Sequence, residues 1–449
     1  MPPKPFDYHK PAIAERFVGR STLVREAVDG LLAEGNSFAI LGGRRCGKSS
    51  ALQAIHDELL RRRLSPKVGE RLAVPALMSL HQLSGAQRKS ADGVLHRLHD
   101  ELRRALERDS WWKTEALQVP AQGRGADTLD DLLGTIAAAV AVTTDRGYSV
   151  RVVLLVDELT SALGHPWTET LFENLRHLVY ASSVVNDLAL VVAGTPRCLD
   201  AQERGSPLFN ALEVLDLDPL DESSLRGLAA AAPGLDEAAT AAVMGACGGS
   251  PYLAQYLLHH MTRQTQRTFD ALLDHARKER DRELMSWWMG IGATGRRLYR
   301  ELAGDRRWRA TGDLAVALGT SIGEMDRALR LLRLHHAIRS RDDGAEHRAD
   351  GDLFRAWVAV QGTVGGNALD RRAIVRALLD AFTSVADWQW LVRLASERNL
   401  EEIAVGNLGD IATTVVEHAA GEAWLDRLLE VALEARPGVA SLRALSAGM

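Results

Sequence analysis

The sequence contains little cysteine and no long apolar run, and each shortage excludes a class of protein. Its three cysteines, Cys46, Cys198 and Cys247, are too few and too scattered for a disulfide framework, and none belongs to a C-x-x-C pair that would suggest zinc. This usage fits a reducing cytoplasm. The most apolar segments, 150–156 and 188–194, are far shorter than the roughly 20 residues of a membrane-spanning helix. We therefore expect buried strands there and no membrane partner.

The N-terminal pattern and the charge balance exclude further classes. Residues 1–16 hold Pro and Lys rather than an apolar core followed by a cleavage site, which predicts an extended lead-in and no secretion signal. The formal charge of -5 and the pI near 6.3 argue against attachment to nucleic acid or to an acidic membrane through the overall field. The 449 residues, 46% hydrophobic and 25% charged, predict about three globular domains of ordinary size.

From Phe17 to about Pro219, apolar segments alternate with helical patterns, which predicts a parallel sheet covered by helices on both faces. The expected strands are rich in β-branched residues and span 37–42, 72–80, 150–157 and 188–195. Beyond Asp221 the pattern is helical, except for a polar turn at 338–350 that could be a hairpin, as in a winged helix-turn-helix. The pattern therefore predicts an α/β core with a parallel sheet, followed by helical domains that include a winged helix.

Residues 42–49 read GGRRCGKS, a complete G-x-x-x-x-G-K-S between a predicted strand and a predicted helix. In such a loop the backbone N–H groups and the helix N-terminus converge on phosphates, Lys48 reaches the outer phosphates, and Ser49 offers a hydroxyl to Mg²⁺. A glycine-rich structural turn is the alternative. The strand before the loop and the helix after it favour a loop that binds the phosphates of ATP or ADP, as in an α/β P-loop NTPase. The residues expected at the nucleotide are Gly42, Gly43, Arg44, Arg45, Cys46, Gly47, Lys48, Ser49 and Ser50.

The third predicted strand ends in VVLLVDE, which places Asp157 and Glu158 at the carboxyl edge of the sheet, where parallel sheets bind ligands. We expect Asp157 to hold Mg²⁺ through its water shell and Glu158 to orient or deprotonate the attacking water. Acidic residues also end strands for solubility, so this interpretation depends on the P-loop upstream. The fourth strand leads into Thr195 and Arg197, either of which would lie at the same edge within reach of a γ-phosphate.

Several of these segments together resemble signal-transduction ATPases with numerous domains (STAND) and archaeal-type AAA+ ATPases. The likeness covers 17 to about 360 and is carried, besides the P-loop and VVLLVDE, by FVGR at 17–20, AGTPR at 193–197 and CGGSPYLAQYL at 247–257. It implies that Arg197 senses the γ-phosphate and acts in catalysis with Lys48, Asp157 and Glu158. The remaining contacts it implies are with the base, through Val18, Gly19, Arg20 and Pro251, although Pro251 could equally be a helix-start proline.

The winged helix departs from this family in one respect. The family often holds a histidine there that contacts the β-phosphate of ADP, whereas Ala349 and Asp350 occupy that place here, and we expect the nearby His347 to be a solvated surface residue. Arg327, Arg330 and Arg333 could form a cationic edge for DNA, but acidic neighbours favour an ordinary solvated face. The tryptophans that we expect to pack rather than stack on bases are Trp111, Trp112, Trp287 and Trp288.

Residues 371–445 resemble the helical effector-associated domains of bacterial conflict systems, death-fold-like adaptors that pair with a like domain on an effector protein. The likeness rests on RAIVRALLDAFTSVADWQWLV at 372–392 and on the segment 415–442. The helices are expected to close at Arg436 and Pro437. A helical cap on the ATPase is the alternative, but the glycine-containing segment before the module favours a detachable adaptor.

The expected layout is a lead-in (1–16), a P-loop ATPase domain (17–220), a helical lid (221–284), a winged helix (285–362), a linker (363–370) and a helical adaptor domain (371–449). The resemblances imply a switch that binds ATP or ADP with Mg²⁺, forms homo-oligomers with ATP and recruits an effector protein, in bacterial antiphage defence. The alternatives are a DNA-binding AAA+ protein akin to replication initiators, a transcription regulator, and a structural nucleotide-binding scaffold.

Overall fold

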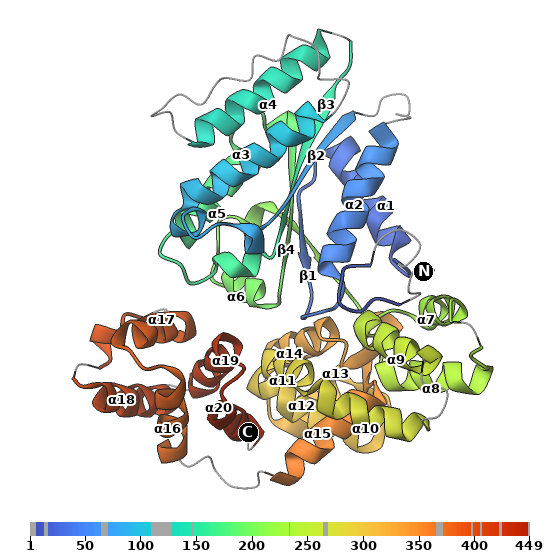
Figure 1. Ribbon diagram of the computed structural model, residues 1–449, viewed down its shortest axis with the longest axis vertical. Coiled ribbons are helices and arrows are strands. Elements are labelled where there is room, and N and C mark those ends of the chain that lie inside the picture. The colour runs from blue at the N-terminus through green and yellow to red at the C-terminus, as the bar shows by residue number, and fades with distance from the viewer. Residues whose placement is uncertain are drawn as a thin grey trace. The chain divides into compact units, whose positions relative to one another are not determined.

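The computed structural model describes most of the chain as two compact units (Figure 1). The described residues are 6–12, 17–63, 71–108, 128–145, 147–232, 234–263, 268–364, 371–396, 398–404, 406–421 and 424–447. One unit is Tyr8–Leu217, and the other combines Met1–Asp7 with Asp218–Met449. Among the described residues, no helix has both the length and the apolar character needed to cross a bilayer.

The unit Tyr8–Leu217 is built on a parallel sheet in the order β2-β3-β4-β1-β5. Its strands are β1 (Phe38–Leu41), β2 (Leu72–Ser79), β3 (Val150–Asp157), β4 (Leu188–Gly194) and β5 (Glu213–Asp216). The four strands expected from apolar segments are confirmed, and so is the parallel α/β class. The fifth strand, β5, was not predicted. It is a short edge strand with partly exposed side chains, so its sequence contains no apolar run of the kind that predicts a buried strand.

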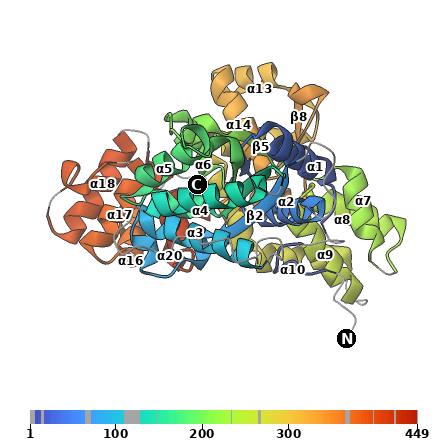
Figure 2. The ribbon, with the colours of Figure 1, turned by 90° about the horizontal axis from the view of Figure 1, so that it is seen from above.

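The helices of this unit cover the sheet and form its core with it. They are α1 (Ser21–Asp29), continued by the π-helical turn η2 (Gly30–Glu34), then α2 (Lys48–Arg63), α3 (Ala91–Glu107), α4 (Thr128–Thr144), α5 (Thr168–Tyr180) and α6 (Arg197–Glu203). The helices α3 and α4 pack side by side in both views (Figure 2). The residues Leu52, Ile55 and Leu59 recur at helical spacing on α2 and are fully buried.

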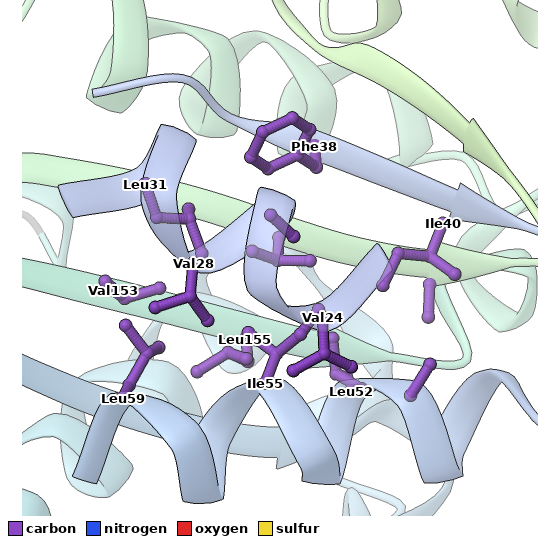
Figure 3. Close-up of a cluster of buried hydrophobic side chains, with 14 of the residues drawn as sticks. Val24, Val28, Leu31, Phe38, Ile40, Leu52, Ile55, Leu59, Val153 and Leu155 are labelled. Carbon is purple, nitrogen blue, oxygen red and sulfur yellow. The ribbon is translucent and has the colours of Figure 1, made fainter. Parts of the chain in front are cut away.

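These side chains meet residues of α1, β1 and β3 in one apolar cluster beside the P-loop (Figure 3). Val24 and Val28 of α1, Ile40 of β1 and Val153 of β3 belong to it, all nearly inaccessible to solvent. Burying a side chain of this size stabilises a fold by about 1.5–3 kcal/mol. The cluster therefore fixes the start of α2 against the sheet, which is where a phosphate cradle needs rigidity.

The second unit begins with helices that end in a small winged helix. These elements are α7 (Glu222–Ala230), α8 (Glu237–Cys247), α9 (Pro251–Arg263), α10 (Phe269–Glu279), α11 (Asp281–Gly290), α12 (Gly292–Asp305), β6 (Arg309–Ala310), α13 (Thr311–Leu318), α14 (Ile322–Leu334), β7 (Ile338–Arg341), β8 (Glu346–Ala349) and α15 (Asp352–Val364). The side chains of Asp221 and Asp236 cap α7 and α8, as their residue type predicts. The antiparallel pair β7–β8 confirms the expected hairpin.

The interior of the winged helix confirms one expectation and corrects another. Trp287 and Trp288 are buried and pack against Phe354, as expected of packing residues. The expectation that His347 is a surface residue is wrong. His347 lies on β8 with its side chain buried, and only 3% of the residue is exposed. Its ring lies 3.0 Å from the Thr311 hydroxyl and 2.8 Å from that of Ser340, and burial lowers its pKa, so neutral imidazole is favoured.

The C-terminal module contains α16 (Arg371–Ala381), α17 (Val385–Ser396), α18 (Leu408–Gly421), α19 (Leu425–Ala435) and α20 (Ala440–Ala447). As expected, α19 ends just before Arg436 and Pro437, but α20 follows where we expected the helices to close. Of the expected linker 363–370, residues 363 and 364 belong to α15, and 365–370 lie outside the described residues. So do Trp111, Trp112 and residues 1–5 and 13–16 of the lead-in.

Two glycines have the same backbone conformation but different surroundings, so they allow the close approach of α8 to Gly351 to be tested. Gly248 follows α8 with φ 60°, and Gly319 follows α13 with φ 62°. A Cβ on Gly248 would lie 2.7 Å from the backbone of Gly351, whereas a Cβ on Gly319 would meet nothing within 4 Å. Gly319→Ala should cost about 1–2 kcal/mol for the left-handed backbone. Gly248→Ala should cost about 1–3 kcal/mol more through overpacking.

Thermal unfolding of the two variants, followed by circular dichroism, compares these costs directly. The expected result is a clearly lower midpoint for Gly248→Ala than for Gly319→Ala. Equal midpoints would contradict the close approach of Gly248 to Gly351.

Candidate functional site

The P-loop occupies the turn between β1 and α2, and its geometry requires the residues found there. A Cβ on Gly42 would fall 2.4 Å from Cys46 Sγ, so only glycine fits. Arg45 (φ 61°) and Gly47 (φ 100°) both adopt left-handed backbone conformations, which make the turn sharp. Because α2 starts at Lys48, the free N–H groups of its first turn face the same loop.

The ammonium group of Lys48 lies folded into this turn. Lys48 is 6% exposed, and its Nζ donates hydrogen bonds to Gly42 O at 3.0 Å and Gly43 O at 2.8 Å. Among the described residues, no carboxylate lies within ion-pairing distance of this group. A buried charge without a counter-charge is costly. The turn therefore fits an anion such as the phosphates of a nucleotide.

The acidic pair lies at the end of β3, which is separated from β1 by β4 alone. Neighbouring strands are about 4.8 Å apart, so the ends of β1 and β3 are about 10 Å apart, a span that a phosphate and a hydrated metal ion can bridge. Asp157 is largely buried, and its Oδ1 accepts a hydrogen bond of 2.8 Å from Glu158 N. A serine hydroxyl and a carboxylate are donors typical of Mg²⁺ held on substrate phosphates, so Ser49 and Asp157 have the chemistry expected of them, and the metal site stays a prediction.

Glu158 has a backbone conformation that its residue type rarely adopts. Its φ of 59° lies in the left-handed region, where a side chain with a Cβ is strained. Strain of this kind persists where the surrounding structure enforces it, and such positions cluster at functional sites. The conformation turns the chain directly after Asp157, the last residue of β3.

The loop after β4 is tied to the loop after β3 by a residue that sequence reasoning missed. Thr160 Oγ1 accepts a hydrogen bond of 2.7 Å from Thr195 N and donates one of 3.2 Å to Thr195 Oγ1. Thr160 lies two residues beyond Glu158 in the 3-10 turn Leu159–Ala162. Nothing in the pattern distinguishes this threonine from any other loop hydroxyl, because the interaction exists only once the two strands are neighbours.

The buried thiol of Cys198 lies at this edge of the sheet, 3.8 Å from the Thr160 hydroxyl. Burial raises the pKa of Cys198 to about 11, while the Thr160 hydroxyl and the positive charges of Arg197 and Lys48 oppose that rise. Cys198 lies just beneath Gly194, where a Cβ would come within 2.5 Å of its Sγ. A thiol with so high a pKa stays neutral and is no nucleophile.

Arg20 donates a hydrogen bond to the backbone of the P-loop. It is buried, and its Nη1 donates a hydrogen bond of 2.7 Å to Cys46 O. Val18 and Gly19 precede α1. Val18 is half-buried, and Gly19 is exposed with φ 76°. The role of these residues at the adenine base stays a prediction.

The lead-in contacts the P-loop helix through its backbone. Ala12 N donates a hydrogen bond of 2.8 Å to Ser50 Oγ, and Arg45 Nη1 donates one of 3.4 Å to Tyr8 O. Ser50 is buried, and its hydroxyl oxygen accepts the hydrogen bond from Ala12. Arg44 is exposed beside it. Sequence reasoning did not find the contact, because an extended segment carries no periodic signal.

The remaining expected residues belong to the second compact unit. Pro251 is the first residue of α9, and Ser250 Oγ accepts a hydrogen bond of 3.3 Å from Leu253 N, which caps that helix. This is the structural role that proline at a helix start usually has. A contact with a base stays a prediction. Arg333, one of the three arginines of the cationic edge, forms an ion pair of 2.8 Å with Asp218.

The Thr160 contact predicts a measurable effect on turnover. Thr160→Val keeps the shape of the side chain but leaves Thr195 N without its acceptor, a loss worth about 1–3 kcal/mol. We expect ATP turnover to fall about tenfold, which corresponds to about 1.4 kcal/mol. ADP affinity should change less than twofold, because Thr160 lies outside the P-loop. Thr160→Ser should restore turnover. Unchanged turnover in Thr160→Val would show that the contact does not position the site.

Comparison with known proteins identifies the C-terminal module. Residues 368–449 match the family model of effector-associated domain 1 (EAD1). A search of curated proteins found no match. Among solved structures, the chain is similar to Aeropyrum pernix ORC1 in complex with DNA (15% identity, TM-score 0.39, covering 76% of this chain and 92% of that one).

Two further structures score alike. They are Aeropyrum pernix ORC2 in ADPNP-ADP complexes (12% identity, TM-score 0.39, 79% and 98% covered) and CDC6P from Pyrobaculum aerophilum (14%, 0.37, 78% and 96%). At these TM-scores the likeness adds no argument about function. The family match covers only the C-terminal module, and there it confirms the effector-associated domain expected at that end of the chain.

Proposed function

We propose that this chain is a nucleotide-controlled switch of the STAND type, which hydrolyses ATP slowly and recruits an effector through its C-terminal module. The observation that carries the proposal is the buried ammonium of Lys48, held in a P-loop with Asp157 and Glu158 two strands away on the same sheet. The match of residues 368–449 to an effector-associated domain supports the output. A regulatory ATPase coupled to an adaptor domain accounts for both.

Discrimination between ADP and ATP must come from groups that touch the γ-phosphate in one state only. Lys48, Arg197 and a Mg²⁺ ion held by Ser49 and Asp157 are the groups suited to make such contacts. The Mg²⁺ ion supplies charge neutralisation of the phosphates when bound. Thr160 links the turn that follows Glu158 to Thr195, which lies two residues before Arg197, so this hydrogen bond can couple a contact at Arg197 to the candidate general base.

In this proposal ADP holds the chain closed and ATP opens it. Open chains associate, and their C-terminal modules gather effector molecules, which raises the local concentration of effector without any new contact chemistry. Glu158 resets the switch by accepting a proton from water that attacks the γ-phosphate. Bacterial defence against phage is the setting that the effector-associated domain supports.

The molecular mass of the full chain in solution tests this proposal. Light scattering with MgADP should report a monomer, and with Mg²⁺ and a slowly hydrolysed ATP analogue it should report a larger assembly. Lys48→Ala should stay monomeric in both. The same mass for the unmutated chain with ADP and with the analogue would contradict the switch and favour a structural nucleotide-binding scaffold.

Binding to DNA is the second candidate, and the winged helix gives it limited support. Arg333 is engaged by Asp218, which leaves a smaller cationic edge on α14 than the sequence suggests. If DNA were the ligand, duplex affinity would fall steeply with salt and would weaken in an Arg327→Gln/Arg330→Gln variant. We expect neither result.

A further inference from the structure

The central part of helix α19 in the C-terminal module is buried. Six consecutive residues, Leu428 to Leu433, are buried, including the charged Glu430. An amphipathic helix at the surface of a small domain normally exposes one stripe of its circumference. Here α17, α18 and α20 cover α19 from within the module, and α11 and α12 cover it from outside. The part of α19 that faces α11 and α12 is called the outer face below.

The contact with α12 contains a buried cation. Arg296, on α12, has a side chain that is 5% exposed, and its Nη2 lies 3.5 Å from Asp426 Oδ2 of α19. Burial lowers the pKa of Arg296, while the carboxylates of Asp426 and Glu430 oppose this fall. A guanidinium group stays charged in proteins. The ion pair with Asp426 thus compensates the buried charge of Arg296, whereas Glu430 is paired within the module with Arg427 at 2.7 Å.

Arg296 also lies beside an apolar side chain of α11. Its Nη1 lies 3.9 Å from the sulfur of Met289 on α11, and Met289 is itself buried. The outer face therefore offers the carboxylate of Asp426 to an arginine that lies beside the apolar side chain of Met289. This is the composition of a specific binding surface, in which a buried charge pair sets the register and apolar contact supplies the affinity.

We propose that the outer face of α19, with Asp426, is the surface by which the module binds its effector, and that α11 and α12 cover it in this state of the chain. The proposal rests on the proposed function in one respect, namely that the module recruits an effector. It adds the surface that does so and the segment that blocks it. Arg296 stands in for a basic residue of the partner.

The chemistry of the outer face defines the partner. Any protein that covers it in place of α12 would have to replace the ion pair that Asp426 makes with Arg296, so it needs a cation at this position. It must also offer apolar side chains around that cation. The partner is therefore a helical surface with an arginine among apolar residues, as α12 presents it. A partner of this kind competes with α12, so binding requires α11 and α12 to separate from α19.

A first measurement asks whether the pair holds the cover in place. Asp426 has a side chain that is 48% exposed, so Asp426→Arg should fold, and it places a like charge beside Arg296. In hydrogen exchange of the full chain without nucleotide, residues 425–435 should lose at least tenfold of their protection. The double variant Arg296→Asp/Asp426→Arg, which reverses the pair, should regain it. Unchanged protection in Asp426→Arg would overturn the proposal.

A second measurement asks whether the uncovered face binds a basic helix. The probe is a synthetic peptide of residues 281–305, which spans α11 and α12, with an Arg296→Glu peptide as control. The full chain carrying Arg296→Glu repels its own cover and keeps the outer face intact. It should bind the probe at least tenfold more tightly than the unmutated chain does, and the control peptide should not bind.

These outcomes separate the two proposals. Loss of protection in Arg296→Glu without binding of the probe would overturn the outer face as a partner surface. If Arg296→Glu fails to fold, the exchange result for Asp426→Arg still decides whether the cover exists. Both measurements are made without nucleotide, so they stand even if ATP and ADP prove equivalent, which would contradict the switch instead.

Discussion

Replacing Lys48 with alanine is expected to weaken MgATP and MgADP binding about 100-fold. The ammonium group of Lys48 is buried in the P-loop, where it donates hydrogen bonds to carbonyl oxygens. Phosphate oxygens would supply the negative charge that pairs with it. A hydrogen bond to a charged group contributes about 1.5–3 kcal/mol, and a loss near the upper end gives the expected factor. Fluorescence titration with a labelled ADP measures it.

Arg44→Ala is the matched control for Lys48→Ala. Arg44 belongs to the same loop and carries the same charge, but it is exposed. Its loss should change affinity by less than about fivefold, since exposed charges interact weakly through water. If the two variants bind ADP equally well, the assignment of Lys48 as the phosphate ligand is wrong.

Glu158→Gln is expected to separate binding from hydrolysis. The amide cannot accept a proton from the attacking water, so turnover should fall about 10²–10⁴-fold, the usual contribution of a general base. Binding of MgATP should stay within a factor of about three, because the phosphate contacts belong to the P-loop. Phosphate release under saturating ATP measures the first quantity, and equilibrium titration measures the second.

Asp157→Asn is the natural comparison for Glu158→Gln. Asp157 is expected at the metal ion, so its replacement should weaken the Mg²⁺ dependence of nucleotide binding, which Glu158→Gln should leave intact. Residual turnover of Glu158→Gln close to that of the unmutated chain would remove this residue from the chemistry. The strained backbone of Glu158 would then need another explanation.

The parts of this account that the sequence predicts are local in the chain. The strands β1, β3 and β4 are continuous apolar runs because both faces of a parallel sheet are covered, and the P-loop is a contiguous motif between a strand and a helix. The hairpin β7–β8 follows from a polar turn between two short strands. In each case the residues that determine the element are neighbours in sequence.

The parts that the sequence does not predict depend on residues brought together by the fold. Thr160 meets Thr195 only because β3 and β4 are adjacent, and Arg20 reaches Cys46 only because α1 lies beside the P-loop. His347 is turned inward by β8, whereas its neighbours in sequence are polar and suggested a surface. The cover on α19 is of the same kind, since Arg296 and Asp426 are far apart in the chain.

Calorimetric titration of the unmutated full chain with ATP and ADP, with and without Mg²⁺, tests the central claim most directly. The account predicts one nucleotide site per chain for both ligands and tighter binding of ATP when Mg²⁺ is present, because the ion joins the γ-phosphate to Ser49 and Asp157. A folded chain that binds neither nucleotide under any of these conditions would contradict the account.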